Sequence, residues 1–336
     1  MNRNARGFTL IEMLVVLAIL AILAAVAISS VDGIQDQSRY DATQRGLQNI
    51  EEAILGPENQ HNPDGTPIVS GFVADIGRLP NATALTGVLK SDGSQAFDMV
   101  ELWLKPAAID NFAIKQGIVA NITSAITDGV PVATPGPTEE DSEVFVPCGW
   151  RGPYIRLGVG QTNLKDGYGN FYDLLQSDRT YCTDGIPAKI IRSRGSNAAV
   201  DNAPTGDYRE DLYENFITNS FDGVSPNYPI AAASDKVSAA SFHVTVLNSD
   251  NTQLDTSTMT VKCFGPDPAT GKIKVIALTT TATAIVAGQM SQEFVFTDPS
   301  LTVGPRIIRA YQNGRKSAIK RVVLQSAGTQ TELFIK

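Results

Sequence analysis

The sequence predicts an α+β protein with a long N-terminal α-helix, a small antiparallel sheet and a C-terminal β-sandwich. Three observations lead to this fold class. The run Met13–Ile28 contains no charged residue, glycine or proline. Two strand-like segments, 171–175 and 188–193, flank a turn-rich connection. Short alternating segments fill the last hundred residues, which is typical of a sandwich.

The composition limits the classes of function. The chain has 336 residues, enough for two or three domains, and a net charge of −8. An acidic chain is a poor partner for nucleic acid, since phosphate binding needs a basic surface. The histidines His61 and His243 lie far apart and there is no CxxC pair, which argues against a zinc site.

The first helix is predicted from Phe8 to Leu55. Between Phe8 and Val31 the only charged residue is Glu12. About 24 residues give about 36 Å of helix, enough for the ~30 Å hydrocarbon core of a membrane. We therefore expect residues 8–31 to be transmembrane. The polar second half carries an apolar stripe, and Gly56-Pro57 is a helix stop.

Three interpretations of this N-terminus compete. The first is a secretory signal peptide cut near Ala24–Ala27, and the second is a plain signal anchor. Both leave Glu12 unexplained, because a charge in the membrane costs roughly 2.5–3.5 kcal/mol on insertion scales. A sequence that keeps Glu12 there needs a partner for it.

The third interpretation is a resemblance. The segment Arg6–Glu12 (RGFTLIE) resembles the processing site of type IV prepilins and type II secretion pseudopilins. The resemblance implies that residues 1–7 are a leader, removed after Gly7 by a prepilin peptidase. Phe8 then becomes the methylated N-terminus, and Glu12 pairs with that amine on a neighbouring subunit. Ser29 departs from the family, whose members often have proline there.

A second resemblance lies in the middle of the chain. The segments Gly149–Ile155 (GWRGPYI) and Lys165–Tyr172 (KDGYGNFY) resemble the major, G-type pseudopilins. This implies a pilin-like globular domain over residues 32–218. Tyr168 stands where the family has tryptophan, and Gly167 where it has proline. Proline- and glycine-rich stretches on either side predict loops, and Phe97–Leu104 predicts a short helix.

The resemblance also implies a calcium loop after the small sheet. Asp201, Asp207 and Asp211 can supply carboxylate oxygens, which calcium prefers. Asn197 stands where the family often has aspartate, and nearby arginines add positive charge. The alternative is an acidic surface loop without a metal. No other cofactor is predicted.

The three cysteines leave two possibilities. Cys148 and Cys182 fall in the same predicted domain, and a disulfide between them is chemically permitted in the periplasm. Two buried thiols are the alternative. Cys263, in a predicted strand, is expected to be a buried side chain.

The C-terminal residues 235–336 predict an immunoglobulin-like β-sandwich. Asn313-Gly314 predicts a tight hairpin between two of its strands. Major pseudopilins end before this point, so the extra domain brings a plain filament repeat into question. The predicted strands are 240–247, 258–264, 272–279, 292–296, 306–311, 318–324 and 331–335.

No catalytic motif is present, and we do not expect an enzyme. The sequence lacks a P-loop, HExxH and GxSxG, and its two histidines are far apart.

The function that we expect is structural. The predicted protein is a subunit of a type II secretion pseudopilus or a type IV pilus, held by one span in the bacterial inner membrane with its globular domains in the periplasm. Its expected partners are other pilin or pseudopilin subunits, the prepilin peptidase, the inner-membrane assembly platform and membrane lipid. The alternative is a membrane-anchored binding protein whose C-terminal sandwich captures a ligand. The sequence leaves open whether the subunit is major, minor or at the tip.

Overall fold

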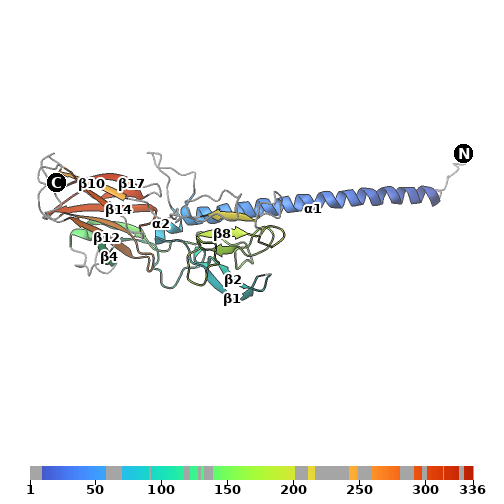
Figure 1. Ribbon diagram of the computed structural model, residues 1–336, viewed down its shortest axis with the longest axis horizontal. Coiled ribbons are helices and arrows are strands. Elements are labelled where there is room, and N and C mark those ends of the chain that lie inside the picture. The colour runs from blue at the N-terminus through green and yellow to red at the C-terminus, as the bar shows by residue number, and fades with distance from the viewer. Residues whose placement is uncertain are drawn as a thin grey trace, which may run out of the picture.

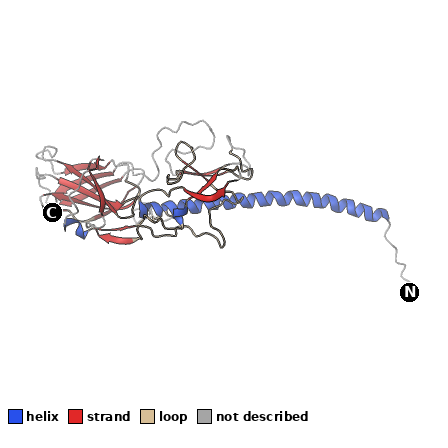
Figure 2. Cartoon of the chain, turned by 90° about the horizontal axis from the view of Figure 1, so that it is seen from below, coloured by secondary structure: helices blue, strands red, loops and turns tan. Residues whose placement is uncertain are grey.

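The structure is a computed structural model in which one long helix projects from a body rich in β-strands (Figures 1 and 2). The N-terminus lies at the free end of the helix, and the C-terminus lies at the opposite end of the molecule. The described residues are 10–57, 70–90, 92–116, 122–127, 130–131, 139–200, 211–215, 242–248, 259–280, 291–296, 301–312, 314–324 and 329–335.

The elements follow one another along the chain as helix, mixed segments and strands. Their bounds are α1 (Leu10–Leu55), α2 (Phe72–Ile76), β1 (Thr83–Leu89), β2 (Gln95–Asp98), η1 (Val100–Leu102), β3 (Ala113–Gln116), β4 (Ile122–Thr127), β5 (Val130–Pro131), η3 (Glu139–Glu143), β6 (Phe145–Cys148), β7 (Asp173–Leu175), β8 (Ile190–Ser193), β9 (Leu212–Asn215), β10 (Phe242–Asn248), β11 (Met259–Pro266), β12 (Ile273–Thr280), β13 (Ser291–Phe296), β14 (Gly304–Gln312), β15 (Arg315–Lys316), β16 (Lys320–Leu324) and β17 (Thr329–Ile335).

Helix α1 has 46 residues and is about 69 Å long. It ends at Leu55, as the sequence predicts, because Gly56 takes a left-handed conformation (φ +95°) and its N–H bonds to the carbonyl of Glu52 at 2.8 Å. The predicted start at Phe8 lies outside the described residues. In the second half of α1, Leu47, Ile50 and Ile54 are buried in the first core.

That first core joins α1 to a three-stranded antiparallel sheet in the order β7-β8-β9. The predicted pairing of 171–175 with 188–193 is confirmed, with Leu174 opposite Ile191. Strand β9, which the sequence analysis did not predict, lies beside α1. Short helix α2 packs on α1 and contributes Phe72 and Ile76 to the same core.

The predicted helix over Phe97–Leu104 is wrong. Gln95–Asp98 instead forms strand β2, which pairs with β1, and only Val100–Leu102 is helical, as a 3-10 turn. The pairing with β1 outweighs the local apolar pattern, and the Asp98 carboxylate accepts the N–H of Met99 at 2.8 Å where the strand ends.

All seven strands predicted near the C-terminus are present, with ends shifted by one or two residues. They form two sheets. One has the order β13-β10-β17, with β10 and β17 parallel. The other runs β15-β14-β11-β12-β4-β5, and β16 pairs with β14. Buried side chains of both sheets form one apolar cluster, which includes Phe242, Phe296, Val261 and Leu324.

The hairpin predicted at Asn313-Gly314 is also present. Gln312 of β14 pairs with Arg315 of β15, which leaves two residues for the turn. Gly314 has a φ of +72°, a conformation that suits glycine. Asn313 lies outside the described residues.

The C-terminal sheet is not built from residues 235–336 alone. Strand β4 (Ile122–Thr127), from the predicted pilin-like domain, pairs in parallel with β12 and extends the sheet. Strands β3 and β6 pair with each other and cover part of the same sheet, where Val146 and Cys148 pack with Phe264 and Ile307. Residues of the predicted pilin-like domain therefore form part of the C-terminal sheet and its core, so the two predicted domains are not separate units.

A buried carboxylate reinforces this connection. Asp141 in η3 is 1% exposed. It accepts a hydrogen bond from Lys262 of β11 at 2.8 Å and one from the Tyr311 hydroxyl of β14 at 2.9 Å. An ion pair of this kind fixes η3 to the sheet, and losing one partner leaves a cation without its counter-charge.

We expect Asp141→Ala to lower the free energy of unfolding by about 2–3 kcal/mol, because it removes a buried partner of Lys262 and Tyr311. Urea unfolding of the full chain in detergent measures this. Glu143→Ala is the control, since this carboxylate is itself 52% exposed and pairs with the exposed Lys316 as well as with the buried Arg309. We expect a much smaller effect there, and equal losses for the two variants would contradict the role given to Asp141.

Candidate functional site

The first half of α1 stands away from the body of the protein and presents apolar side chains to the outside. Residues 10–24 are all exposed; Leu10 is 85% exposed and Leu23 is 59% exposed. Glu12 lies in the first turn of the helix and is the only charged residue in this stretch. An apolar surface of this length, on the part of the helix that projects from the body, is suited to bind other apolar helices or lipid.

Two of the three predicted processing and assembly residues cannot be placed. Gly7 and Phe8 lie outside the described residues, and only Glu12 is positioned. Over the part of the chain that the structure describes, no helix has the length and the hydropathy of a membrane span. The span over residues 8–31 stays a prediction.

The second half of α1 is held by the loop that carries the KDGYGNFY segment. The N–H of Gly167 donates to the Thr43 hydroxyl at 2.9 Å, and this hydroxyl donates to the carbonyl of Arg39 at 2.9 Å. A side chain at position 167 would collide with the Arg39 carbonyl. Proline, which the resembled family has here, would bring this collision and would lack the N–H. Glycine therefore allows a closer contact between loop and helix.

Asp166 shapes this loop and joins it to the sheet. One carboxylate oxygen accepts the N–H groups of Tyr168 (3.0 Å) and Asn170 (2.8 Å), which forms a compact turn. The other accepts the Ser193 hydroxyl of β8 at 2.7 Å. The same loop thus contacts the helix on one side and the sheet on the other.

A glycine on the helix itself contributes to the contact. A Cβ at Gly46 would lie 2.6 Å from the hydroxyl of Tyr172, so the absence of a side chain leaves room for the tyrosine ring. Glycine costs about 1 kcal/mol relative to alanine inside a helix. Here that cost allows close packing between α1 and the start of the sheet.

The GWRGPYI segment packs on α2 and η1. Tyr154 and Arg151 both donate to the carboxylate of Asp75 at 2.9 Å, and the Trp150 indole donates to the carbonyl of Glu101 at 2.8 Å. The rings of Phe72 and Tyr154 meet edge to face at 5.4 Å. The KDGYGNFY segment therefore contacts α1, and the GWRGPYI segment contacts α2 and η1, around the first core.

A cluster of charges that the sequence analysis missed lies at the edge of this domain. Asp173 is fully buried and contacts Lys90 (2.6 Å), Arg192 (2.7 Å) and Arg194 (2.8 Å). Burial raises the pKa of Asp173, but hydrogen bonds from Arg194 and Lys90 outweigh it and hold the pKa below its usual value. The cluster links the end of β1 to β7 and β8.

The sequence did carry a signal for this cluster. Arg192 lies in the segment 188–193 predicted as a strand and Arg194 follows directly after it, so an extended chain projects both to the same face. Two cations on the same face of a strand in a small core require a buried carboxylate. Which carboxylate they meet depends on the fold, because Asp173 lies on the neighbouring strand.

The calcium site stays a prediction, because Asp201 and Asp207 lie outside the described residues. Asp211 is buried, lies 3.9 Å from Arg192 and accepts the Tyr213 hydroxyl at 3.2 Å. The charges of Arg192 and Arg194 disfavour a divalent cation here. Within the described part of the chain, no group of three potential metal ligands gathers.

Of the two possibilities for Cys148 and Cys182, the structure has the second, two buried thiols. Both are buried free thiols, and they belong to different clusters: Cys148 faces the C-terminal sheet, whereas Cys182 lies in the first core beside Pro187. Burial raises the pKa of each thiol to about 11, so neither is a reactive thiolate near neutral pH. Cys263 is also buried, as expected.

Comparison with known proteins identifies the N-terminal segment. Residues 2–28 match the prokaryotic N-terminal methylation motif. This motif fits the class of type IV pilins and pseudopilins, which are processed by prepilin peptidase and methylated at the new N-terminus. No curated protein and no solved structure matches the chain.

We expect Gly167→Ala to lower the free energy of unfolding by about 2 kcal/mol or more, because the new methyl group must push the loop away from α1. Chemical unfolding followed by circular dichroism measures the change.

Gly158→Ala is the control for that substitution. Its Cβ would meet only the flexible end of Gln161, at 3.0 Å. We expect a change within about 0.5 kcal/mol. Similar losses at both positions would show that the close approach at Gly167 has no special importance.

The pH dependence of stability should reflect Asp98 and Asp75. Burial raises the pKa of Asp98 to about 7, although it accepts the N–H groups of Leu164 and Met99. Burial also raises the pKa of Asp75 to about 6, against the charge of Arg151. Between about pH 4 and pH 7 the folded chain therefore binds more protons than the unfolded chain, and the free energy of unfolding falls as pH rises.

We accordingly expect a higher melting temperature at pH 5 than at pH 8, with Asp173 acting in the opposite direction only below about pH 4. Asp98→Asn should flatten the profile between pH 5 and pH 8, while Asp178→Asn, at an exposed carboxylate, should not. An unchanged slope in Asp98→Asn would rule out Asp98 as its source.

Proposed function

We propose that this protein is a filament subunit of the type IV pilin-like class, working in a type II secretion pseudopilus or a type IV pilus. The methylation motif at residues 2–28, continued by a projecting apolar helix, carries this proposal. On this proposal a prepilin peptidase cuts after Gly7, and the chain then assembles through α1. The cut removes two arginines and makes the chain more acidic, from −8 to −10.

Glu12 is the residue on which assembly depends. A carboxylate in an apolar helix bundle is stable only next to a positive charge or several hydrogen-bond donors. The amine of Phe8, freed by the cut, supplies such a charge on a neighbouring subunit. The attraction between the two grows as water is excluded, because the effective dielectric constant falls. This contact therefore both stabilises the filament and sets the axial register of the helices.

Before assembly, the subunit is held in the membrane. We propose that residues 8–31 lie in the inner membrane, with the globular part in the periplasm, until the assembly platform extracts them. In the filament the apolar side chains exchange lipid for neighbouring helices. The exchange keeps them out of water, so the hydrophobic effect opposes neither state. Direction then comes from the Glu12 contact and from the work of the platform.

The C-terminal part favours a minor or tip subunit. We propose that its two sheets are an immunoglobulin-like sandwich, interlocked with the pilin-like domain through β4, β6 and η3. A large domain that cannot swing aside must fit at each lateral position of a repeating filament. At a tip it meets no such neighbour and remains available for contacts with other proteins.

We expect Glu12→Gln to reduce filament incorporation at least tenfold, because a neutral amide cannot balance the N-terminal amine. Immunoblots of sheared filaments against total cell protein measure the fraction assembled. Glu52→Gln, at an exposed position in the second half of the same helix, should leave incorporation unchanged. Normal incorporation of Glu12→Gln would refute the assembly mechanism.

The mass of the mature N-terminus tests processing separately from assembly. We expect a chain that begins with N-methylated Phe8, and Gly7→Lys should leave the full leader in place. A chain that keeps Met1, or that is cut after Ala27, would exclude the prepilin class and favour a signal anchor or a signal peptide.

A further inference from the structure

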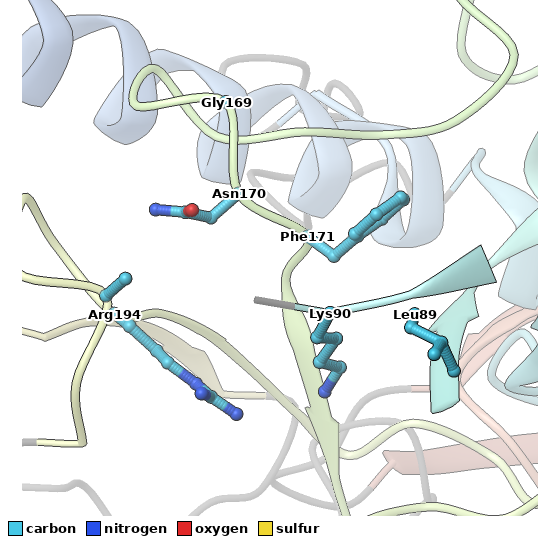
Figure 3. Close-up of a pocket in the computed structure, with 7 residues that line it drawn as sticks. Leu89, Lys90, Gly169, Asn170, Phe171 and Arg194 are labelled. Atoms are coloured by element: carbon cyan, nitrogen blue, oxygen red, sulfur yellow. The ribbon is translucent and has the colours of Figure 1, made fainter. Parts of the chain in front are cut away.

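A small cavity lies beside the charge cluster of Asp173, at the meeting point of three segments far apart in the sequence (Figure 3). The segments are the end of β1, the loop after Asp166 and the turn after β8. The cavity has a volume of about 170 Å³. Its lining residues are Leu89, Lys90, Gly169, Asn170, Phe171, Arg194 and Ala198.

Two cations line the cavity, although the whole cluster has equal numbers of positive and negative charges. The side chains of Lys90 and Arg194 are 7% and 8% exposed, and both line the space. Their carboxylate partners Asp173 and Asp92 are not among the lining residues, and no carboxylate of the described chain is. The hydrogen bond to Asp173 uses one of the three N–H donors of Lys90. Donors therefore remain for an anion in the cavity.

The number of positive and negative groups around the cavity determines the charge of the anion that can bind. Lys90, Arg192 and Arg194 face the carboxylates of Asp173, Asp92 and Asp211. A dianion such as phosphate would leave this partly buried site with two excess negative charges. A carboxylate adds only one, and Arg194 can meet it by releasing Asp92, which is 42% exposed and so contributes little.

The remaining wall fits the carbon skeleton of such an acid. Leu89 and Phe171 are apolar, and Asn170 presents an amide that can bond to a carboxylate or a hydroxyl. The volume is below the roughly 300–1,000 Å³ of pockets that hold drug-sized ligands, so only the end of a ligand enters. We propose that the cavity binds the carboxylate end of a small organic acid, either an acidic sugar or an acidic side chain. This proposal is independent of filament assembly.

Ligand-observed saturation-transfer NMR on the full chain in detergent micelles tests the binding. Two pairs of probes are used. Within each pair, the acid and its neutral analogue show whether the negative charge is needed for binding. The comparison between the pairs distinguishes an acidic sugar from an acidic side chain. The pairs are glucuronate with glucose, and N-acetylglutamate methylamide with its glutamine analogue. We expect signal from at least one acid and none from its neutral partner. The acid that binds more tightly identifies the source.

Variants assign the binding to this cavity. Asn170→Asp places a negative charge in the wall without touching the contacts of Asp173, and should weaken acid binding at least tenfold. Lys90→Met should do the same by removing the ammonium group. Lys320→Met, at an exposed position of strand β16, should bind like the unchanged protein. Leu89→Asp, at a 59% exposed position of the wall, replaces Asn170→Asp if that variant fails to fold by circular dichroism.

Four results would overturn the proposal or its preference for a single charge. The first is equal signal from the acids and their neutral analogues, and the second is no signal from any of them. The third is acid binding that survives both a folded Asp variant and Lys90→Met. Displacement of the acid by phosphate at a lower concentration than by acetate would also refute the preference for a single charge.

Discussion

The contact between Gly167 and the third quarter of α1 is the constraint on which the rest of the structure depends. At this contact the N–H of Gly167 donates to the Thr43 hydroxyl of the 46-residue helix. Position 167 has no side chain that would separate the loop from the helix. Asp166 joins the same loop to the sheet by accepting a hydrogen bond from the Ser193 hydroxyl. Because helix, loop and sheet meet within a few residues, the direction of the projecting half of α1 is fixed by the body of the protein.

The sequence predicted what local patterns determine. Helix α1 ends at Leu55 because Gly56-Pro57 is a strong stop, and the C-terminal strands follow their period-two patterns. Contacts between distant segments were not predictable in this way. The strand β2 at Gln95–Asp98 depends on β1, and β4 depends on a partner far along the chain.

The same limit applies to the candidate sites. The RGFTLIE segment is a local motif, and it was found from the sequence because processing and pairing act on adjacent residues. The choice between a disulfide and two thiols was not predictable from the sequence, because Cys148 and Cys182 of one predicted domain belong to different cores. In the Asp173 cluster, Arg192 and Arg194 meet a carboxylate on the neighbouring strand, and their ion pairs cross-link the edge of this domain.

The parallel pairing of β4 with β12 has a consequence for how the protein is made. Ile122 must meet Ile273, about 150 residues later in the chain, before this edge of the sheet can form. During synthesis, the edge of β4 therefore stays unpaired until most of the chain has emerged. An open edge invites pairing with other chains. Until residue 273 is available, pairing of β4 between nascent copies competes with its pairing to β12.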